Sequence, residues 1–175
     1  INSKFIPGNK ILKIPNGVLI PQNAVTLAEK SNSFCFVGLV CPRKRTLESI
    51  KYFHKNYSHI DGARLYIVGP HSGLENNAEI SQTYIDACLE FVRNNELEQR
   101  VIFTGNLNKE QVFDIYKNSK ALLFFSEKEG MPNSVLEAMS YNCVPIVTSM
   151  DGVMEEVLEN GNSGFIIENI DFSIP

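Results

Sequence analysis

The spacing of hydrophobic positions changes repeatedly along most of the chain. Short runs that are apolar throughout predict buried strands, and stretches with an apolar residue every three or four positions predict amphipathic helices. The expected strands cover 33–40, 64–69, 100–104, 121–125, 144–148 and 164–167, and the expected helices cover 46–57, 79–95, 109–117, 134–141 and 154–158. Apolar strands that alternate with such helices are typical of a parallel sheet covered on both faces. The sequence therefore predicts an α/β domain with a doubly wound, Rossmann-like parallel sheet.

The first 32 residues have a different pattern. They are dense in turn-forming residues, with Pro7, Gly8, Pro15, Asn16-Gly17 and Pro21, and leave room only for a short strand over 10–14. The chain also begins at an isoleucine and not at a methionine. We expect residues 1–32 to be an interdomain segment, residues 33–175 to be the Rossmann-like domain, and the whole to be a piece of a longer protein.

Composition and charge exclude several classes of protein. With 175 residues, 43% of them hydrophobic, the chain can bury one sizeable core. A net charge of -4 without a dense basic stretch argues against nucleic-acid binding. The four cysteines show no Cys-x-x-Cys spacing, which indicates a reduced protein without structural zinc. No apolar run approaches the length of a transmembrane helix and no signal-peptide pattern opens the chain, so we expect a cytoplasmic protein.

The loops that follow the expected strands should meet at one edge of the sheet, where such folds bind ligands. The first of these loops runs from Gly38 to Arg45 and lacks both the Gly-x-Gly-x-x-Gly fingerprint and the Walker pattern, which argues against a dehydrogenase. It offers one glycine, for close backbone approach, and then Lys44 at the start of a helix. This lysine either neutralises a diphosphate or is a solvated surface residue, and the cluster Arg43-Lys44-Arg45 has the same two interpretations.

A metal site is not expected. The aspartates at 61, 86, 114 and 151 are scattered, without the paired acidic ligands that magnesium needs beside phosphates. The three histidines have no suitably spaced partners and are interpreted as structural or solvated residues.

Two glutamates eight positions apart flank a glycine-proline loop that leads into a helix. The segment from Glu129 to Glu137 reads Glu-Gly-Met-Pro-Asn-Ser-Val-Leu-Glu. A helix N-terminus favours a bound anion such as phosphate, and this interpretation places one carboxylate before the anion site and one after it. The alternative is a capping box, in which Ser134 caps the helix and Glu137 folds back onto it.

The wider context of this segment resembles a known family. The run from Glu129 to Met139, followed by Val144-Pro145-Ile-Val and then by 151–157, is similar to the donor-binding half of family 4 glycosyltransferases of the GT-B architecture. Residues 14–18 and Phe36-Val37-Gly38 with Lys44 agree with this likeness, which spans nearly the whole chain. Two positions depart from the family: Leu39 stands where it usually has an arginine, and Asp151-Gly152 replaces paired glycines. Arg43 and Arg45 are candidates for the missing positive charge.

The resemblance implies a role for each matching residue. Glu137 would bind the ribose hydroxyls of a nucleotide sugar, Glu129 would face the donor sugar, and Lys44 would stabilise the leaving phosphate. The backbone of Gly130, Met131, Pro132 and Asn133 would line the sugar, and the N–H groups of Ser134 and Val135 would meet the diphosphate. Gly38 would let the backbone of the first turn approach the ligand closely. Gly105 and Asn106 would lie near the nucleobase. The family typically retains anomeric configuration and needs neither a metal nor another cofactor.

The expectation is thus the donor-binding half of a retaining glycosyltransferase. It would take a UDP-sugar in preference, either a UDP-hexose or a UDP-N-acetylhexosamine, and serve cell-surface polysaccharide biosynthesis in the cytoplasm or at its membrane face. The glycan or lipid-linked acceptor would be bound mainly by an N-terminal domain that this chain lacks, so the chain alone would bind a nucleotide and transfer nothing. One alternative is a GT-B nucleotide-sugar epimerase, which would need further acid and base residues. The other is a non-catalytic nucleotide-binding interaction domain in which Glu137 only caps its helix.

Overall fold

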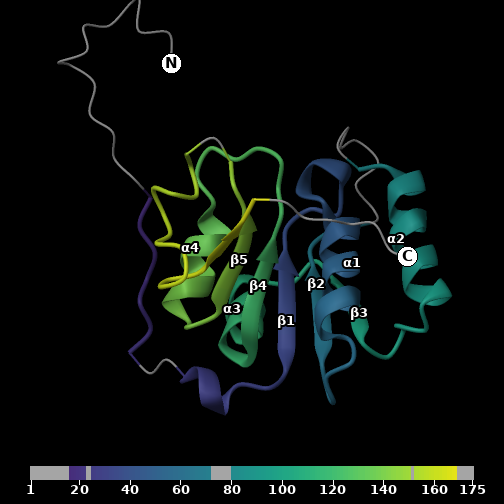
Figure 1. Cartoon of the computed structure of the whole chain (residues 1–175), viewed down its shortest axis with the longest axis horizontal. Coiled ribbons are helices and arrows are strands. Elements are labelled where there is room, and N and C mark those ends of the chain that lie inside the picture. Colours follow the sequence, from purple (N-terminus) through teal and green to yellow (C-terminus); the bar gives the residue numbers. More distant parts are fainter. Residues whose placement is uncertain (1–15, 23–24, 72–79, 151, 169–175) are drawn as a thin grey trace, which may run out of the picture.

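A single parallel sheet organises the chain. The computed structural model describes residues 16–22, 25–71, 80–150 and 152–168. Its six strands lie in the order β3-β2-β1-β4-β5-β6, and every neighbouring pair is parallel (Figure 1). The strands are β1 (Ser33–Val37), β2 (Arg64–Val68), β3 (Val101–Gly105), β4 (Ser119–Phe124), β5 (Val144–Thr148) and β6 (Phe165–Ile167). The strand order reverses between β1 and β4, which is where open parallel sheets bind ligands.

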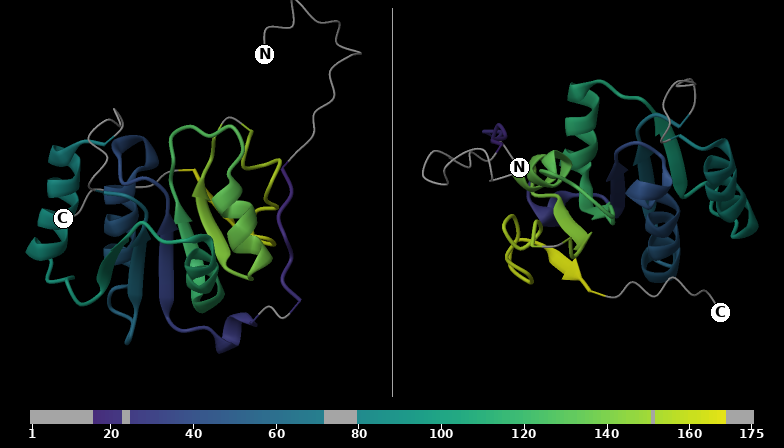
Figure 2. Two further views of the ribbon diagram at one scale, coloured as in Figure 1. Left: turned by 180° about the vertical axis from the view of Figure 1, so that it is seen from behind. Right: turned by 90° about the horizontal axis from the view of Figure 1, so that it is seen from above.

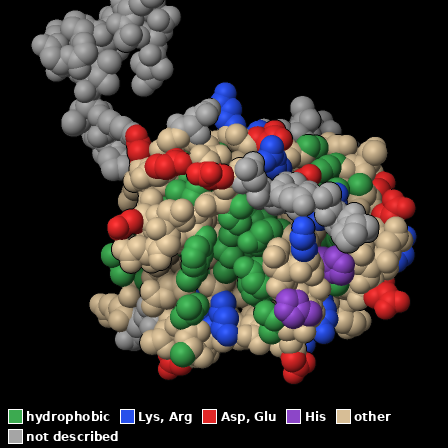
Figure 3. Space-filling model, viewed as in Figure 1, with side chains coloured by type: hydrophobic (Ala, Val, Ile, Leu, Met, Phe, Trp, Pro, Cys, Tyr) green, Lys and Arg blue, Asp and Glu red, His purple; other side chains and the backbone are tan. Residues whose placement is uncertain are grey.

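Helices cover both faces of this sheet. In the view from above, α1 (Thr46–Tyr57) and α2 (Gln82–Asn94) lie on one side, and α3 (Lys109–Asn118) and α4 (Asn133–Ser140) lie on the other (Figure 2). Successive strand residues point to opposite faces, so Phe34 and Phe36 of β1 join the core under α1 and α2, while Cys35 joins the core under α3 and α4. On the face seen in Figure 3, hydrophobic side chains also reach the surface near its centre. The predicted doubly wound, Rossmann-like sheet is confirmed.

Two predicted elements differ from the structure. The helix expected over 154–158 is wrong, because residues 152–157 form a series of turns and Gly152 has a φ of 83°. The side chains of Met154 and Leu158 are buried all the same, so the apolar spacing marked core residues and not a helix. The first strand ends at Val37 and not at residue 40. The short strand expected over 10–14 lies outside the described residues.

The segment before β1 is anchored at the C-terminal end of α3 by a buried lysine. Lys30 follows the short 3-10 helix η2 (Leu27–Glu29) and is only 5% exposed. Its Nζ donates to the carbonyls of Tyr116 at 2.7 Å and Ser119 at 2.9 Å, at the C-terminal end of α3, where a positive charge is favourable. Burial lowers the pKa of the Lys30 ammonium.

Lys30→Met should lower the free energy of unfolding by about 1–3 kcal/mol, because two carbonyls lose a charged donor in a place that water does not reach. Urea denaturation of the chain measures the change. Lys117→Met is the matched control, since Lys117 is exposed in the last turn of the same helix and its removal should cost less than about 0.5 kcal/mol. Equal losses of unfolding free energy in the two variants would show that Lys30 does not anchor this segment.

Candidate functional site

Two loops meet at the carboxyl end of the sheet, beside the point where the strand order reverses. The first follows β1 and contains the 3-10 helix η3 (Pro42–Lys44), and the second follows β4. The first loop is fixed to β2, because the Gly38 N–H donates to the Val68 carbonyl at 2.9 Å. The two loops are joined through the backbone, since the Glu127 N–H donates to the Arg43 carbonyl at 2.9 Å. Residues far apart in the sequence are thus joined by backbone hydrogen bonds at one end of the sheet.

Lys44 and Glu129 form an ion pair between these loops. Lys44 Nζ donates to Glu129 Oε1, and the two side chains are only 17% and 14% exposed. Ser126 Oγ donates to the same oxygen at 2.6 Å, and Arg43 Nη1 lies 3.6 Å from it. Shielding from water strengthens these electrostatic contacts. The structure therefore brings together the two residues predicted to be catalytic.

Glycines let the neighbouring turns approach each other closely. A Cβ on Gly69 would lie 1.9 Å from the Gly38 carbonyl oxygen, and Gly69 has a φ of 141°. The Gly69 N–H donates to the Gly105 carbonyl at 2.9 Å, so the turns after β1, β2 and β3 are linked in a row. Gly105, predicted near the nucleobase with Asn106, ends the edge strand β3, and Asn106 follows it. Among the described residues, neither of the two forms a hydrogen bond or ion pair with Lys44 or Glu129.

The capping box considered as the alternative at the start of α4 is not formed. The helix begins at Asn133 with Pro132 at the N-cap position, and no side chain caps it. The Pro132 carbonyl accepts from the N–H groups of Val135 at 3.0 Å and Leu136 at 3.2 Å, which places Ser134 inside the first turn. Glu137 is therefore not a capping residue. The Val135 N–H, expected to meet a diphosphate, would have to exchange its bond to Pro132 to do so.

Glu137 lines a small pocket between α3, α4 and the segment before β1. The pocket has a volume of about 110 Å³ and is formed by Glu137 with Lys109, Phe113, Ser140 and residues 17–19. Burial raises the pKa of the Glu137 carboxyl, and the charge of Lys109 opposes this shift. A carboxylate beside a hydroxyl and a cation is a suitable acceptor for ligand hydroxyl groups.

The start of α4 is in contact with the segment before β1. Asn16 Nδ2 donates to Asn133 Oδ1 at 2.8 Å, which engages the side chain of one residue predicted to line the sugar. Gly130 is exposed and Met131 half-buried, while Pro132 is buried. Gly130 and Met131 therefore leave the loop accessible between the two glutamates.

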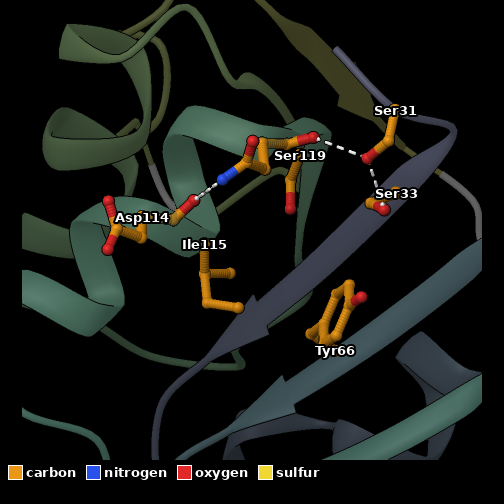
Figure 4. A pocket seen from close by; sticks show the side chains of 7 residues that line it. Ser31, Ser33, Tyr66, Asp114, Ile115 and Ser119 are labelled. Atoms are coloured by element: carbon orange, nitrogen blue, oxygen red, sulfur yellow. Dashed lines mark hydrogen bonds between the residues drawn. The ribbon is translucent and has the colours of Figure 1, made fainter.

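A second pocket lies at the opposite end of the sheet (Figure 4). It has a volume of about 330 Å³ and is lined by residues from β1, β2, α3 and the start of β4: Ser31, Ser33, Tyr66, Asp114, Ile115, Asn118 and Ser119. None of these lining residues carries a positive charge. A diphosphate would meet no cation in this pocket. The charge of a diphosphate therefore favours the site at the carboxyl end of the sheet, where Lys44 lies.

The described part of the chain contains no cluster of three or more His, Cys, Asp or Glu side chains that could hold a metal ion. Within the same residues, no helix has the length and apolar character needed to span a membrane.

Ser126 is a site residue that the sequence reasoning missed. It lies two residues after the end of β4, is 1% exposed, and precedes Glu129 by three positions. A lone serine at the end of a buried strand was the only available signal. Of the two arginines considered for a second positive charge, Arg43 lies beside Glu129, whereas Arg45 Nε pairs with Glu127 Oε1 at 3.2 Å on the exposed rim.

The reversed strand order and the charged site beside it define a Rossmann-like ligand-binding domain of the kind that forms one half of GT-B enzymes. The chain belongs to the family of glycosyl transferases group 1, whose family model matches residues 21–171.

Similar proteins with known names extend this finding. The chain is 30% identical over 125 residues to N-acetyl-alpha-D-glucosaminyl L-malate synthase of Bacillus anthracis, covering 71% of this chain and 29% of that protein. It is 29% identical over 183 aligned positions to UDP-Gal:alpha-D-GlcNAc-diphosphoundecaprenol alpha-1,3-galactosyltransferase of Escherichia coli, covering 96% and 44%. The chain thus spans less than half the length of these two relatives.

Solved structures show the same fold. The lipopolysaccharide outer core galactosyltransferase WaaB in its apo form matches with a TM-score of 0.67 and 25% identity, over 90% of this chain and 42% of that one. The C-terminal domain of the group 1 glycosyl transferase LpcC from Francisella tularensis matches with a TM-score of 0.67 and 20% identity, over 78% and 67%.

Proposed function

We propose that the chain is the donor-binding half of a retaining glycosyltransferase that takes a sugar from a nucleoside diphosphate sugar. The acceptor is a glycan or a glycolipid of the cell surface, bound mainly by a second domain. The observation that carries the proposal is the mostly buried ion pair of Lys44 and Glu129 at the carboxyl end of a sheet from this family.

The chemistry of the reaction gives each side chain a task. When the bond between the anomeric carbon and the phosphate oxygen breaks, negative charge accumulates on the leaving diphosphate and positive charge on the sugar. Lys44 stabilises the phosphate by placing a fixed cation beside it, and the carboxylate of Glu129 holds a sugar hydroxyl or stabilises the anomeric carbon. The proposal includes retention of anomeric configuration and phosphate stabilisation by the protein's own cations instead of by a metal.

The named relatives favour a particular donor and acceptor. The relative from Escherichia coli is named for UDP-Gal and for a diphosphoundecaprenol-linked sugar, and WaaB is named for the lipopolysaccharide outer core. These names support a UDP-sugar, either a UDP-hexose or a UDP-N-acetylhexosamine, and an acceptor in cell-surface polysaccharide assembly.

Calorimetry of the chain with UDP, GDP, a set of UDP-sugars and NAD tests the proposal. Saturable binding of a nucleoside diphosphate, with UDP tighter than GDP, is the expected result. Binding of NAD, or no binding of any nucleotide, would contradict it. Production of a sugar isomer by the full-length protein from the nucleotide sugar alone would instead identify an epimerase.

Glu137→Gln should weaken UDP binding about tenfold, because the ribose hydroxyls lose a charged acceptor. The variant should remain as stable as the parent chain, since burial already works against ionisation of this carboxyl. Glu110→Gln is the matched control, as Glu110 is exposed in the first turn of α3. An unchanged dissociation constant for UDP in Glu137→Gln would show that Glu137 does not bind the ribose.

A further inference from the structure

One oxygen of Glu129 is held by donors from both loops. Glu129 Oε1 accepts from Lys44 Nζ and from Ser126 Oγ at 2.6 Å, with Arg43 Nη1 at 3.6 Å. We call the side chains of Arg43, Lys44 and Ser126 around this oxygen the oxygen cradle; Lys44 and Ser126 donate to it, and Arg43, whose Nη1 donates to the Lys128 carbonyl at 3.2 Å, adds a nearby positive charge. All of the cradle's contacts with Glu129 go to Oε1, and within the described residues Oε2 has no hydrogen bond or ion pair.

The cradle has the chemistry of a phosphate-oxygen site. Two cations and a hydroxyl around one negatively charged oxygen suit a carboxylate and a phosphate equally well. Ser126 is almost fully buried, so its hydroxyl depends on an acceptor inside the site. In this structure the near acceptor is Glu129 Oε1 at 2.6 Å, and the Arg43 carbonyl oxygen lies farther away at 3.4 Å.

We propose that Glu129 is an intramolecular competitor for the phosphate. Its Oε1 occupies the position in the oxygen cradle that a phosphate oxygen of the nucleoside diphosphate takes on binding. This inference rests on the proposed function, and it adds Arg43 and Ser126 as phosphate-binding residues. On binding, Glu129 turns out of the cradle and its carboxylate becomes free to meet the sugar.

The loop around Glu129 permits this movement. The next residue, Gly130, is exposed, and a Cβ placed on it would have no atom within 4 Å. Space is therefore open beside the backbone directly after Glu129. The cradle itself is fixed, because Arg43 and Glu127 are joined through the backbone and Ser126 is buried two residues after the end of β4.

The proposal reverses the usual expectation for a substrate-binding residue. Breaking the ion pair of Lys44 and Glu129 offsets part of the phosphate's binding free energy, and the carboxylate also repels the incoming diphosphate. Glutamine at 129 has nearly the same shape without the charge. Removing Glu129's charge should thus tighten the binding of a nucleoside diphosphate that carries no sugar.

The test is calorimetry of the 175-residue chain with UDP, comparing the parent with Glu129→Gln. We expect Glu129→Gln to bind UDP about three- to tenfold tighter, since releasing a mostly buried ion pair is worth up to about one factor of ten. Glu127→Gln is the matched control in the same loop. Glu127 is 53% exposed and pairs with Arg45 outside the cradle, so its variant should bind UDP as the parent does.

A second pair of variants tests the cradle itself. Ser126→Ala and Arg43→Met should weaken UDP binding about threefold or more, whereas Arg45→Met should leave it unchanged. Circular dichroism verifies that each variant is folded at the temperature of the titration.

The outcomes separate the two proposals. If the parent chain binds UDP and Glu129→Gln binds it equally or more weakly, the competitor role is overturned while the proposed function stands. If neither the parent nor Glu129→Gln binds any nucleoside diphosphate, the proposed function and this inference fail together. If Glu129→Gln binds UDP and the parent chain does not, the competition of Glu129 with the phosphate is supported.

Discussion

Replacing Lys44 with methionine is expected to weaken UDP binding by about ten- to hundredfold, the range for losing a hydrogen bond to a charged group at a shielded position. Methionine keeps most of the aliphatic length of the lysine and removes only its charge. In the oxygen cradle, Arg43 and Ser126 would then have to hold the phosphate alone while Glu129 still repels it. In the full-length enzyme, the same variant should lose transfer activity, because the leaving diphosphate is no longer neutralised.

Two controls make the Lys44 result specific. Lys128→Met removes a lysine from the facing loop, where residue 128 is exposed, and should bind UDP as the parent does. Unfolding by urea, followed by circular dichroism, verifies that Lys44→Met is folded when it is titrated. Parent-like affinity in the folded variant would show that Lys44 is not a phosphate ligand.

Gly69→Ala is expected to lower the free energy of unfolding by about 3 kcal/mol or more, at the upper end for single substitutions. The added Cβ would lie 1.9 Å from the carbonyl oxygen of Gly38, and both groups belong to backbone that cannot rotate away. The turns after β1 and β2 would have to separate, which also displaces the loop that carries Lys44. Urea denaturation measures the loss, and UDP titration should show weaker binding in whatever remains folded.

Gly62→Ala is the matched control for Gly69→Ala. Gly62 has a φ of 69°, but a Cβ there would have no atom within 4 Å. Its replacement costs only the strain of a left-handed alanine, about 1–2 kcal/mol. Similar losses at the two positions would show that the turn after β1 yields easily and that the close approach does not matter.

The sequence predicted the sheet well because each strand is buried on both faces. Phe34, Cys35 and Phe36 enter two different cores, so the strand has to be apolar at every position, and a pattern read along the chain detects this. The start of α3 was also predicted, because Asn108 and Gln111 form a reciprocal capping box. The pattern failed at Met154 and Leu158, where burial does not require a helix.

The candidate site was predictable only in part. Lys44 and Glu129 lie 85 positions apart, and their pairing depends on the order of strands, which a local pattern does not contain. The resemblance implied the roles of Lys44 and Glu129, and the structure shows that their side chains form an ion pair. The spacing of Ser134 and Glu137 also fitted a capping box, an alternative that the structure removes because Pro132, two residues before Ser134, stands at the N-cap position. Ser126 could not be identified without knowing which oxygen it faces.

The edge strand β3 has a consequence for handling the protein in solution. Within the described ranges it pairs only with β2, and its residues Val-Ile-Phe-Thr-Gly carry no charge that would discourage another chain from adding a strand. The nearest charge, Arg100, points inward, with Nη1 donating to the carbonyls of Ile60 at 3.1 Å and Ala63 at 3.4 Å. Concentrated samples should therefore aggregate edge to edge, and a lysine introduced at Ile102 would act as a gatekeeper against it.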